Sequence, residues 1–156
     1  MRQATLYEGR ALTTPVDRCR ECNQVMPKQV GASITNSNDI YQLMRMQGYD
    51  TAEQETFMVF AMDTRNNILD KAEVSKGGVN VVHVQPSDVL RPALLKACPQ
   101  IIVAHNHPSG DSTPSPDDRL LTERISSAAA LMGIRLLDHV IVARGNYYSF
   151  CDAGDL

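Results

Sequence analysis

A short apolar run that ends in two histidines constrains the fold of this chain more than any other feature. The residues Ile101-Ile102-Val103-Ala104 are apolar and mostly β-branched, and His105-Asn106-His107 follow directly. A run of this length and composition is typical of a buried central strand. Since residues two apart in an extended segment point the same way, both imidazoles are expected to face one cleft at the end of that strand.

The segment after the histidines is a polar loop stiffened by prolines, and it leads into a predicted helix over 117–132 that Gly133 closes. Asp117 and Asp118 stand at the start of this helix. Each acid can cap the helix N-terminus, where the helix dipole favours negative charge, or can bind a metal. Both roles are compatible if each residue takes one.

These residue types together indicate a zinc site. Neutral imidazole is a good zinc ligand, and a carboxylate from the next helix would complete a set of three with His105 and His107. Three protein ligands leave the fourth tetrahedral position for water, which is typical of catalytic rather than structural zinc. A His-x-His pair alone is weak evidence for a metal, and its place between a buried strand and an acidic helix start strengthens the prediction.

The remaining patterns predict an α/β fold with a mixed, largely antiparallel sheet flanked by helices. Two further helices are expected to begin at the cap residues Ser37-Asn38-Asp39 and Pro86-Ser87-Asp88. The second is expected to run through Val89, Leu94, Leu95 and Ala97, with Pro92 near its first turn, where a missing amide costs little. Strands are expected over 55–63, 68–74, 79–84, 101–104, 136–142 and 147–150.

Residues 1–33 show no sustained hydrophobic period and are predicted to form a loosely structured arm before a domain over 34–156. The arm contains Cys19 and Cys22, which have the spacing of half a zinc knuckle, although no second close pair exists in the chain. Three interpretations stay open for this pair: a structural zinc that a homodimer could complete, a redox pair, or no metal at all.

Isolated cysteines and histidines elsewhere suggest no further site. Cys98 and Cys151 are predicted to be buried structural thiols. His83 alternates with Val82 and Val84 and is predicted to lie on a strand surface.

Length and charge exclude several classes of protein. The 156 residues suit one ordinary domain, and the net charge of −3 gives no overall basic footprint for nucleic acid. No stretch approaches the roughly 20 apolar residues of a transmembrane helix, and the N-terminus lacks the apolar core of a signal peptide. The four cysteines do not resemble a secreted disulfide framework. A cytoplasmic, reduced protein is expected.

The sequence resembles a known family at these residues. His105-x-His107, then Ser115, then Asp118 match the JAMM motif of the JAB/MPN metalloprotease fold. The motif His-Asn-His-Pro-Ser-Gly, with Leu137-Asp138-His139-Val140-Ile141-Val142 downstream, resembles the RadC branch of this fold. The resemblance covers about residues 35 to 154. The resemblance implies an MPN/JAB fold with cytidine-deaminase-like architecture. RadC-like proteins often carry an N-terminal helix-hairpin-helix region, which this sequence does not show.

The resemblance also implies roles for individual residues. His105, His107 and Asp118 match the zinc ligands, and Ser115 matches the serine that stabilises the oxyanion. Glu55, at the start of the predicted strand over 55–63, matches the acid/base glutamate, with Glu53 as the alternative on the same strand face.

One adjacent pair can support the ligands from outside the metal site. Asp138 and His139 are candidates for this, since zinc-bound imidazoles commonly donate their other N–H to a neighbouring acceptor. A purely structural role in the strand is the alternative for both residues.

Two classes of function follow. The first is a zinc metallohydrolase that cleaves a peptide or isopeptide bond with a zinc-activated water. The second is a DNA-repair-associated accessory protein, which the RadC name implies and the acidic charge does not support. A binding module with a structural zinc is a third possibility, because fold does not imply activity. The peptide or protein substrate cannot be read from these residues.

Overall fold

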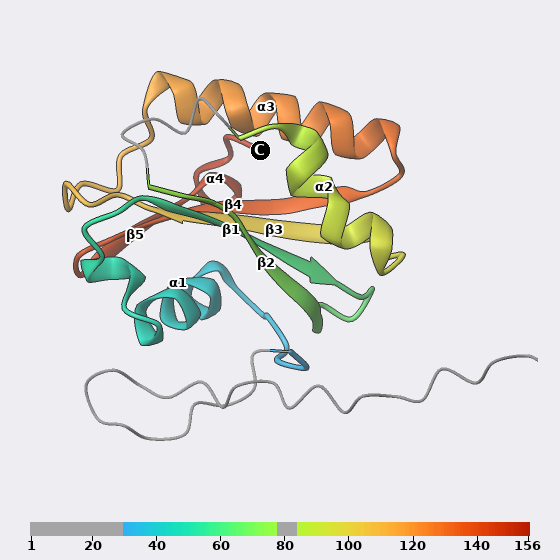
Figure 1. Cartoon of the computed structure of the whole chain (residues 1–156), viewed down its shortest axis with the longest axis horizontal. Helices are drawn as coiled ribbons and strands as arrows, with labels where there is room; N and C mark the ends of the chain where they lie inside the picture. Colours follow the sequence, from blue (N-terminus) through green and yellow to red (C-terminus); the bar gives the residue numbers. More distant parts are fainter. Residues whose placement is uncertain (1–29, 78–83) are drawn as a thin grey trace, which may run out of the picture.

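One five-stranded sheet separates two layers of helix in residues 30–77 and 84–156, the part of the chain that this computed structural model describes (Figure 1). In chain order the elements are α1 (Ser37–Met46), a 3-10 turn η1 (Tyr49–Thr51), β1 (Thr56–Met62), β2 (Ile68–Lys76), α2 (Pro86–Leu95), β3 (Gln100–Asn106), α3 (Pro116–Leu131), β4 (Arg135–Ala143), β5 (Asn146–Ser149) and α4 (Phe150–Ala153).

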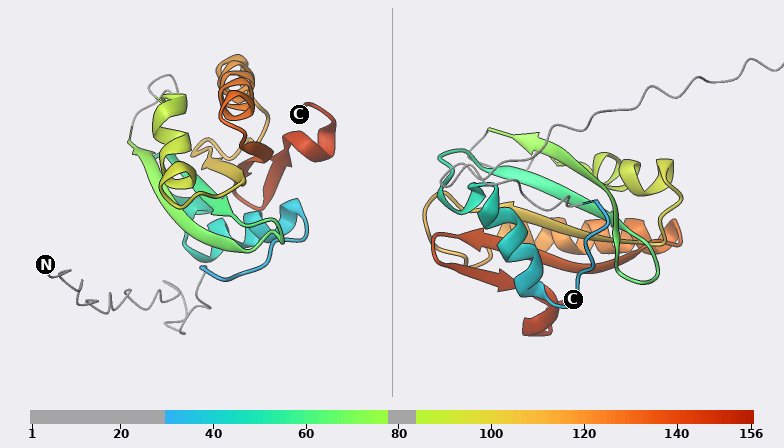
Figure 2. Two further views of the ribbon diagram at one scale, coloured as in Figure 1. Left: turned by 90° about the vertical axis from the view of Figure 1, so that its right-hand side faces the viewer. Right: turned by 90° about the horizontal axis from the view of Figure 1, so that it is seen from below.

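The strands are arranged in the order β2-β1-β3-β4-β5. β3 and β4 are parallel, and every other neighbouring pair is antiparallel. Helices α2 and α3 cover one face of the sheet and α1 covers the other (Figures 1 and 2). The predicted fold class, a mixed and largely antiparallel sheet flanked by helices, is confirmed.

The central strands are buried on both faces, and their side chains alternate between two apolar clusters. In β3, Ile101 and Val103 pack into the cluster beneath α2 and α3, whereas Ile102 and Ala104 pack into the cluster beneath α1. Because alternate residues of a strand share a face, His105 lies on the face that α2 and α3 cover. The alternation that buries β3 therefore also directs His105 toward α3.

Helix α2 differs from its predicted form. Gln85 is the N-cap and Pro86 is the first helical residue, a position that proline favours because its fixed φ suits the helix and no amide is required there. The earlier start places Pro92 inside the helix rather than in its first turn, and Pro92 is buried. The helix ends at Leu95, so the expectation that it continues through Ala97 is wrong, and Leu94 and Leu95 are 47% and 78% exposed. The buried residues of the helix are Val89, Leu90, Pro92 and Ala93.

The C-terminal end also differs from the prediction. The last strand ends at Ser149, and Phe150 begins α4, because the Ser149 side chain accepts a hydrogen bond from the Asp152 amide as a helix N-cap does. Cys98 is buried as predicted. Cys151 is exposed, and the prediction that it is a buried thiol is wrong.

Parts of two sequence predictions fall outside the described residues. These are the first 29 residues of the predicted arm, with Cys19 and Cys22, and most of the predicted strand over 79–84, with His83. The described end of the arm pairs with the start of β2: the Gly31 amide donates to the Ile68 carbonyl at 2.7 Å, and the Ile68 amide donates to the Ala32 carbonyl at 2.9 Å. Among the described helices, none combines the length and apolar character needed to cross a membrane.

Candidate metal centre

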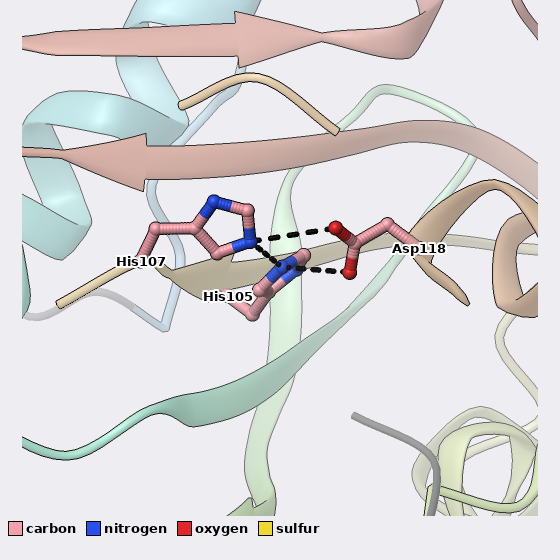
Figure 3. A group of neighbouring side chains, drawn as sticks. All are labelled: His105, His107 and Asp118. Atoms are coloured by element: carbon pink, nitrogen blue, oxygen red, sulfur yellow. Dashed lines mark hydrogen bonds and ion pairs between the residues drawn. The ribbon is translucent and has the colours of Figure 1, made fainter. Parts of the chain in front are cut away.

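Two histidines and one aspartate meet where β3 ends and α3 begins (Figure 3). His105 is the second-last residue of β3, His107 follows the strand, and Asp118 lies in the first turn of α3. One ligand atom from each residue lies within 4.8 Å of the others. The structure thus brings together the three side chains that were predicted to bind zinc.

Local backbone contacts position the two histidines. The His107 amide donates to the Val142 carbonyl of β4 at 2.8 Å, which continues the extended path of the chain beyond β3. The loop then turns at Gly110, whose amide donates to the His107 carbonyl at 3.1 Å and whose φ of 85° suits glycine.

A capping box positions Asp118. Ser115 is the N-cap of α3, and its hydroxyl accepts a hydrogen bond from the Asp118 amide at 3.1 Å. The Ser115 hydroxyl and amide in turn both donate to Oδ2 of Asp118, at 2.6 and 2.7 Å. The other carboxylate oxygen, Oδ1, lies 3.1 Å from Nε2 of His105. Asp118 therefore takes part in the helix cap and also presents Oδ1 to the two histidines, whereas Asp117 is exposed.

Hydrogen bonding leaves one buried acceptor unpaired at the centre of this group. Nδ1 of His107 lies 2.8 Å from the Asp111 carbonyl, which can only accept, so in the neutral ring that binds a metal Nδ1 carries the proton and Nε2 carries a lone pair. Nε2 of His107 lies 3.0 Å from Nε2 of His105 and 3.4 Å from Oδ2 of Asp118. Oδ1 of Asp118 is buried and has no hydrogen-bond partner. A buried acceptor rarely remains unpaired, and a cation held between the three side chains would satisfy it.

The spacing of these atoms fits a tetrahedral zinc ion. Zinc binds nitrogen and oxygen at about 2.0–2.2 Å, which places two ligand atoms of a tetrahedron about 3.3–3.6 Å apart. The closest contacts here, 3.0 Å between the two Nε2 atoms and 3.1 Å from His105 to Asp118, are slightly shorter than this range. Small adjustments of the side chains would therefore accommodate the ion.

The charge of Asp118 suits a ligand. Burial on its own would raise the pKa of this carboxyl, but the contacts with His105 and His107 outweigh burial and hold the pKa well below its usual range. The carboxylate is therefore ionised, as metal binding requires.

Glu55 lies beside this group, directly before β1. Its Oε1 is 3.9 Å from Nε2 of His105, and its side chain is 15% exposed. Burial raises the pKa of Glu55 to about 7, and the charge of Asp118 acts in the same direction. A carboxyl that titrates near neutral pH suits general acid/base chemistry. Glu53, the alternative, is exposed.

Asn106, between the two histidines, is a residue that the sequence reasoning passed over. Its Oδ1 accepts a hydrogen bond from the Thr56 amide at 2.8 Å, and its Nδ2 donates to the Gln54 carbonyl at 3.0 Å. These are the residues on either side of Glu55, so the amide of Asn106 holds both flanks of the glutamate. A polar residue at the end of a buried strand was the available signal, because a buried amide needs partners.

The Asp138–His139 pair separates into two roles. Asp138 accepts hydrogen bonds from the Ser149 hydroxyl at 2.6 Å and from the Cys151 amide at 3.0 Å, which tie β4 to β5 and α4. His139 contacts a predicted ligand directly, with its Nε2 2.8 Å from Nδ1 of His105. The predicted support of the ligands therefore falls to His139.

Comparison with known proteins relates the chain to one family. A family model described as the RadC-like JAB domain matches residues 34–155. A protein of Histophilus somni named UPF0758 protein is 39% identical over 118 residues, 76% of this chain and 53% of the relative. A UPF0758 protein of Thermotoga maritima is 36% identical over 154 residues, 99% of this chain and 64% of the relative. The chain spans about half the length of several curated relatives that it matches.

Proposed function

This chain belongs to the RadC-like JAB domain family, and we propose that it is a zinc-dependent hydrolase of peptide or isopeptide bonds. The observation that carries the proposal is the convergence of His105, His107 and Asp118, in which Oδ1 of Asp118 is buried without a hydrogen-bond partner, with the carboxyl of Glu55 beside them. Family membership supports the choice of an amide bond as the target. The proposal concerns this domain, since the matched relatives are longer.

The residues of the chain divide the chemistry between them. Zinc, when bound by His105, His107 and Asp118, supplies a Lewis acid that makes water nucleophilic at neutral pH. Glu55 accepts a proton from the attacking water as the new carbon–oxygen bond forms. It then returns that proton to the amide nitrogen as the carbon–nitrogen bond breaks. The products are a carboxylate and an amine, and the protein needs no serine or cysteine nucleophile.

Ser115 is the candidate for stabilising the oxyanion of the tetrahedral intermediate. Its hydroxyl donates to Oδ2 of Asp118, and the Ser115 amide donates to the same oxygen. The hydrogen bond from the Ser115 backbone amide keeps Oδ2 of Asp118 partnered. The Ser115 hydroxyl can therefore turn toward a substrate oxygen without leaving this carboxylate oxygen unpaired.

The first experiment measures zinc in purified protein after removal of loosely bound metal. We expect about one zinc ion per chain in the wild type, because three protein ligands are the usual set of a catalytic site. His107→Ala should lose this ion, since it removes one of the three ligands. A zinc content unchanged in His107→Ala would contradict the assigned ligands.

The second experiment separates the ligands from the acid/base residue. Glu55→Gln keeps the shape of the side chain and removes the base, so it should retain zinc and lose hydrolysis of a fluorogenic peptide library by at least about 10²-fold. Glu53→Gln is the matched control and should retain both, because Glu53 is exposed. A fully active Glu55→Gln variant, or a zinc-loaded wild type that cleaves no peptide in the library, would count against the proposal.

A further inference from the structure

His139 lies beneath the metal centre and is fully buried. Its ring stacks on the ring of Phe150, with the two ring centroids 5.0 Å apart. It packs edge to face with the ring of Phe57, with a centroid distance of 5.6 Å. Each ring nitrogen has a neighbour: Nε2 lies 2.8 Å from Nδ1 of His105, and Nδ1 lies 2.6 Å from the hydroxyl of Thr122. A charged imidazole is costly to bury between two phenyl rings when neither nitrogen meets a carboxylate, so His139 is neutral.

The hydrogen-bond donors and acceptors from Thr122 through His139 to His105 can be assigned by starting at Thr122. The Thr122 hydroxyl lies 2.6 Å from the backbone carbonyl of Asp118, and a carbonyl has no proton to give. The single hydroxyl proton of Thr122 is therefore directed at that carbonyl. Toward His139, the hydroxyl oxygen can then only accept, so Nδ1 of His139 carries the proton.

The assignment continues to the ligand. Neutral His139 with a proton on Nδ1 has a lone pair on Nε2, which can only accept from Nδ1 of His105. His105 therefore carries its proton on Nδ1 and a lone pair on Nε2. That lone pair faces Asp118 and His107, where a metal ligand must present it.

An irregularity in β4 places His139 in this position. Leu136 packs beneath α2 and α3 and Leu137 beneath α1, so regular alternation would put His139 with Leu137 on the face of α1. The pairing of β4 with β3 instead passes from Leu136 to Asp138, which leaves Leu137 as an extra residue. A bulge of this kind redirects the residues that follow it, and His139 consequently meets Thr122 of α3.

We propose that Thr122 and His139 are positioning residues that hold His105 in the tautomer able to bind the metal. Hydrogen bonds run from the backbone carbonyl of Asp118 through Thr122 and His139 to Nδ1 of His105, whose Nε2 lies 3.1 Å from Oδ1 of the same aspartate. Two ligands on different elements are thus set by one network. The inference rests on the metal site of the proposed function and extends it to residues that do not touch the metal.

The test compares Thr122→Val with Thr122→Ser. Valine keeps the branched shape of threonine and removes the hydroxyl, so Nδ1 of His139 loses its acceptor and both tautomers of His139 become available. Serine keeps the hydroxyl. The tautomer is read from long-range nitrogen–proton correlation spectra of histidine-labelled, metal-free protein at pH 8. We expect His105 protonated on Nδ1 in the wild type and Thr122→Ser, and a mixture of tautomers in Thr122→Val.

Zinc affinity provides the second measurement, by competition with a chelator of known affinity. Loss of a residue that orients a metal-binding histidine typically weakens binding by about 10–100-fold, and we expect a loss in this range for Thr122→Val. Thr122→Ser should remain within a few-fold of the wild type. Both substitutions lie at one position, and only Thr122→Ser keeps the hydroxyl. Zinc affinity that is retained in Thr122→Ser and lost in Thr122→Val would therefore be due to the hydroxyl and not to packing.

The outcomes separate this inference from the proposed function. If wild-type His105 carries its proton on Nε2, or if Thr122→Val keeps both the tautomer and the zinc affinity of the wild type, the inference is wrong even when the enzyme is active. If wild-type protein binds zinc but cleaves no peptide, the tautomer and affinity measurements still decide the role of Thr122 and His139.

Discussion

At the scale of single residues, the spacing of the sequence predicted which side chains meet but not what surrounds them. The convergence of His105 and His107 follows from the two-residue period of an extended chain, which sequence reports directly. The contacts of Asn106 and His139 depend on which strands are neighbours and on a bulge in β4, and these are set by packing between distant segments. No local pattern carries that information.

The hydrogen bonds of Asn106 lead to a prediction about the acid/base glutamate. Asn106→Ala removes the bonds to the Thr56 amide and the Gln54 carbonyl, so the residues on either side of Glu55 lose two hydrogen bonds to the end of β3. A displacement of about 1 Å in a reacting group can cost about 10²-fold in rate. We expect zinc to be retained and peptide hydrolysis to fall by about 10–100-fold, measured by metal analysis and by steady-state kinetics.

The matched control is Gln54→Ala, which keeps the backbone carbonyl that Asn106 contacts and removes only an exposed side chain. It should leave the rate unchanged. An Asn106→Ala variant with wild-type activity would show that Glu55 needs no such attachment.

At the scale of helices and strands, the elements that build the site were the most predictable. The limits of β1, β3 and α3 lie within two residues of their predicted positions, because long apolar runs and a glycine stop are strong local signals. Helix α2 was less predictable, since its four C-terminal apolar residues do not reveal which of them meets the sheet. The burial of Pro92 and the exposure of Leu95 are decided by how α2 lies on β1 and α3.

The capping box of α3 predicts an effect on stability as well as on the metal. Ser115→Ala removes the hydroxyl that accepts from the Asp118 amide and donates to Oδ2 of Asp118. Loss of an N-cap side chain costs about 0.5–2 kcal/mol, so the free energy of unfolding in urea should fall by about 1 kcal/mol in metal-free protein. Zinc affinity should also fall, because one of the bonds that orient the carboxylate is lost.

Asp117→Ala tests whether this effect belongs to the box. Asp117 is exposed in the same helical turn, and its loss should change the free energy of unfolding by no more than about 0.5 kcal/mol. Equal destabilisation by both substitutions would indicate a general effect of negative charge at the helix start and not the specific bonds of Ser115.

At the scale of the whole molecule, the candidate ligands connect the sheet to the helical layer that covers it. His105 belongs to the central strand β3, and Asp118 belongs to the helix that covers it. The fold class could be predicted because the order of strands and helices is visible in the sequence. The order in which the strands lie in the sheet could not, since it depends on which faces bury one another. Weak binding of DNA, expected from the net charge of −3, stays a prediction.

A bound ion that joins β3 to α3 should stabilise the folded domain, because the unfolded chain presents no prearranged site. Free zinc at about 100 times its dissociation constant would add about 2.7 kcal/mol to the free energy of unfolding. For a domain of this size that corresponds to an increase in Tm of about 5–10 °C. The measurement is thermal unfolding of metal-free protein with and without zinc, followed by reversal with a chelator.

Two variants locate the ion that produces the increase. His107→Ala should abolish the zinc-dependent change in Tm, because it removes one of the three converging ligands. Replacing Cys19 and Cys22 together by serine should leave the change intact if the ion binds at the centre on β3 and α3. The reverse pattern, a change in Tm that survives His107→Ala and disappears with the cysteines, would transfer the stabilising zinc to the Cys19–Cys22 pair and contradict the ligand assignment made here.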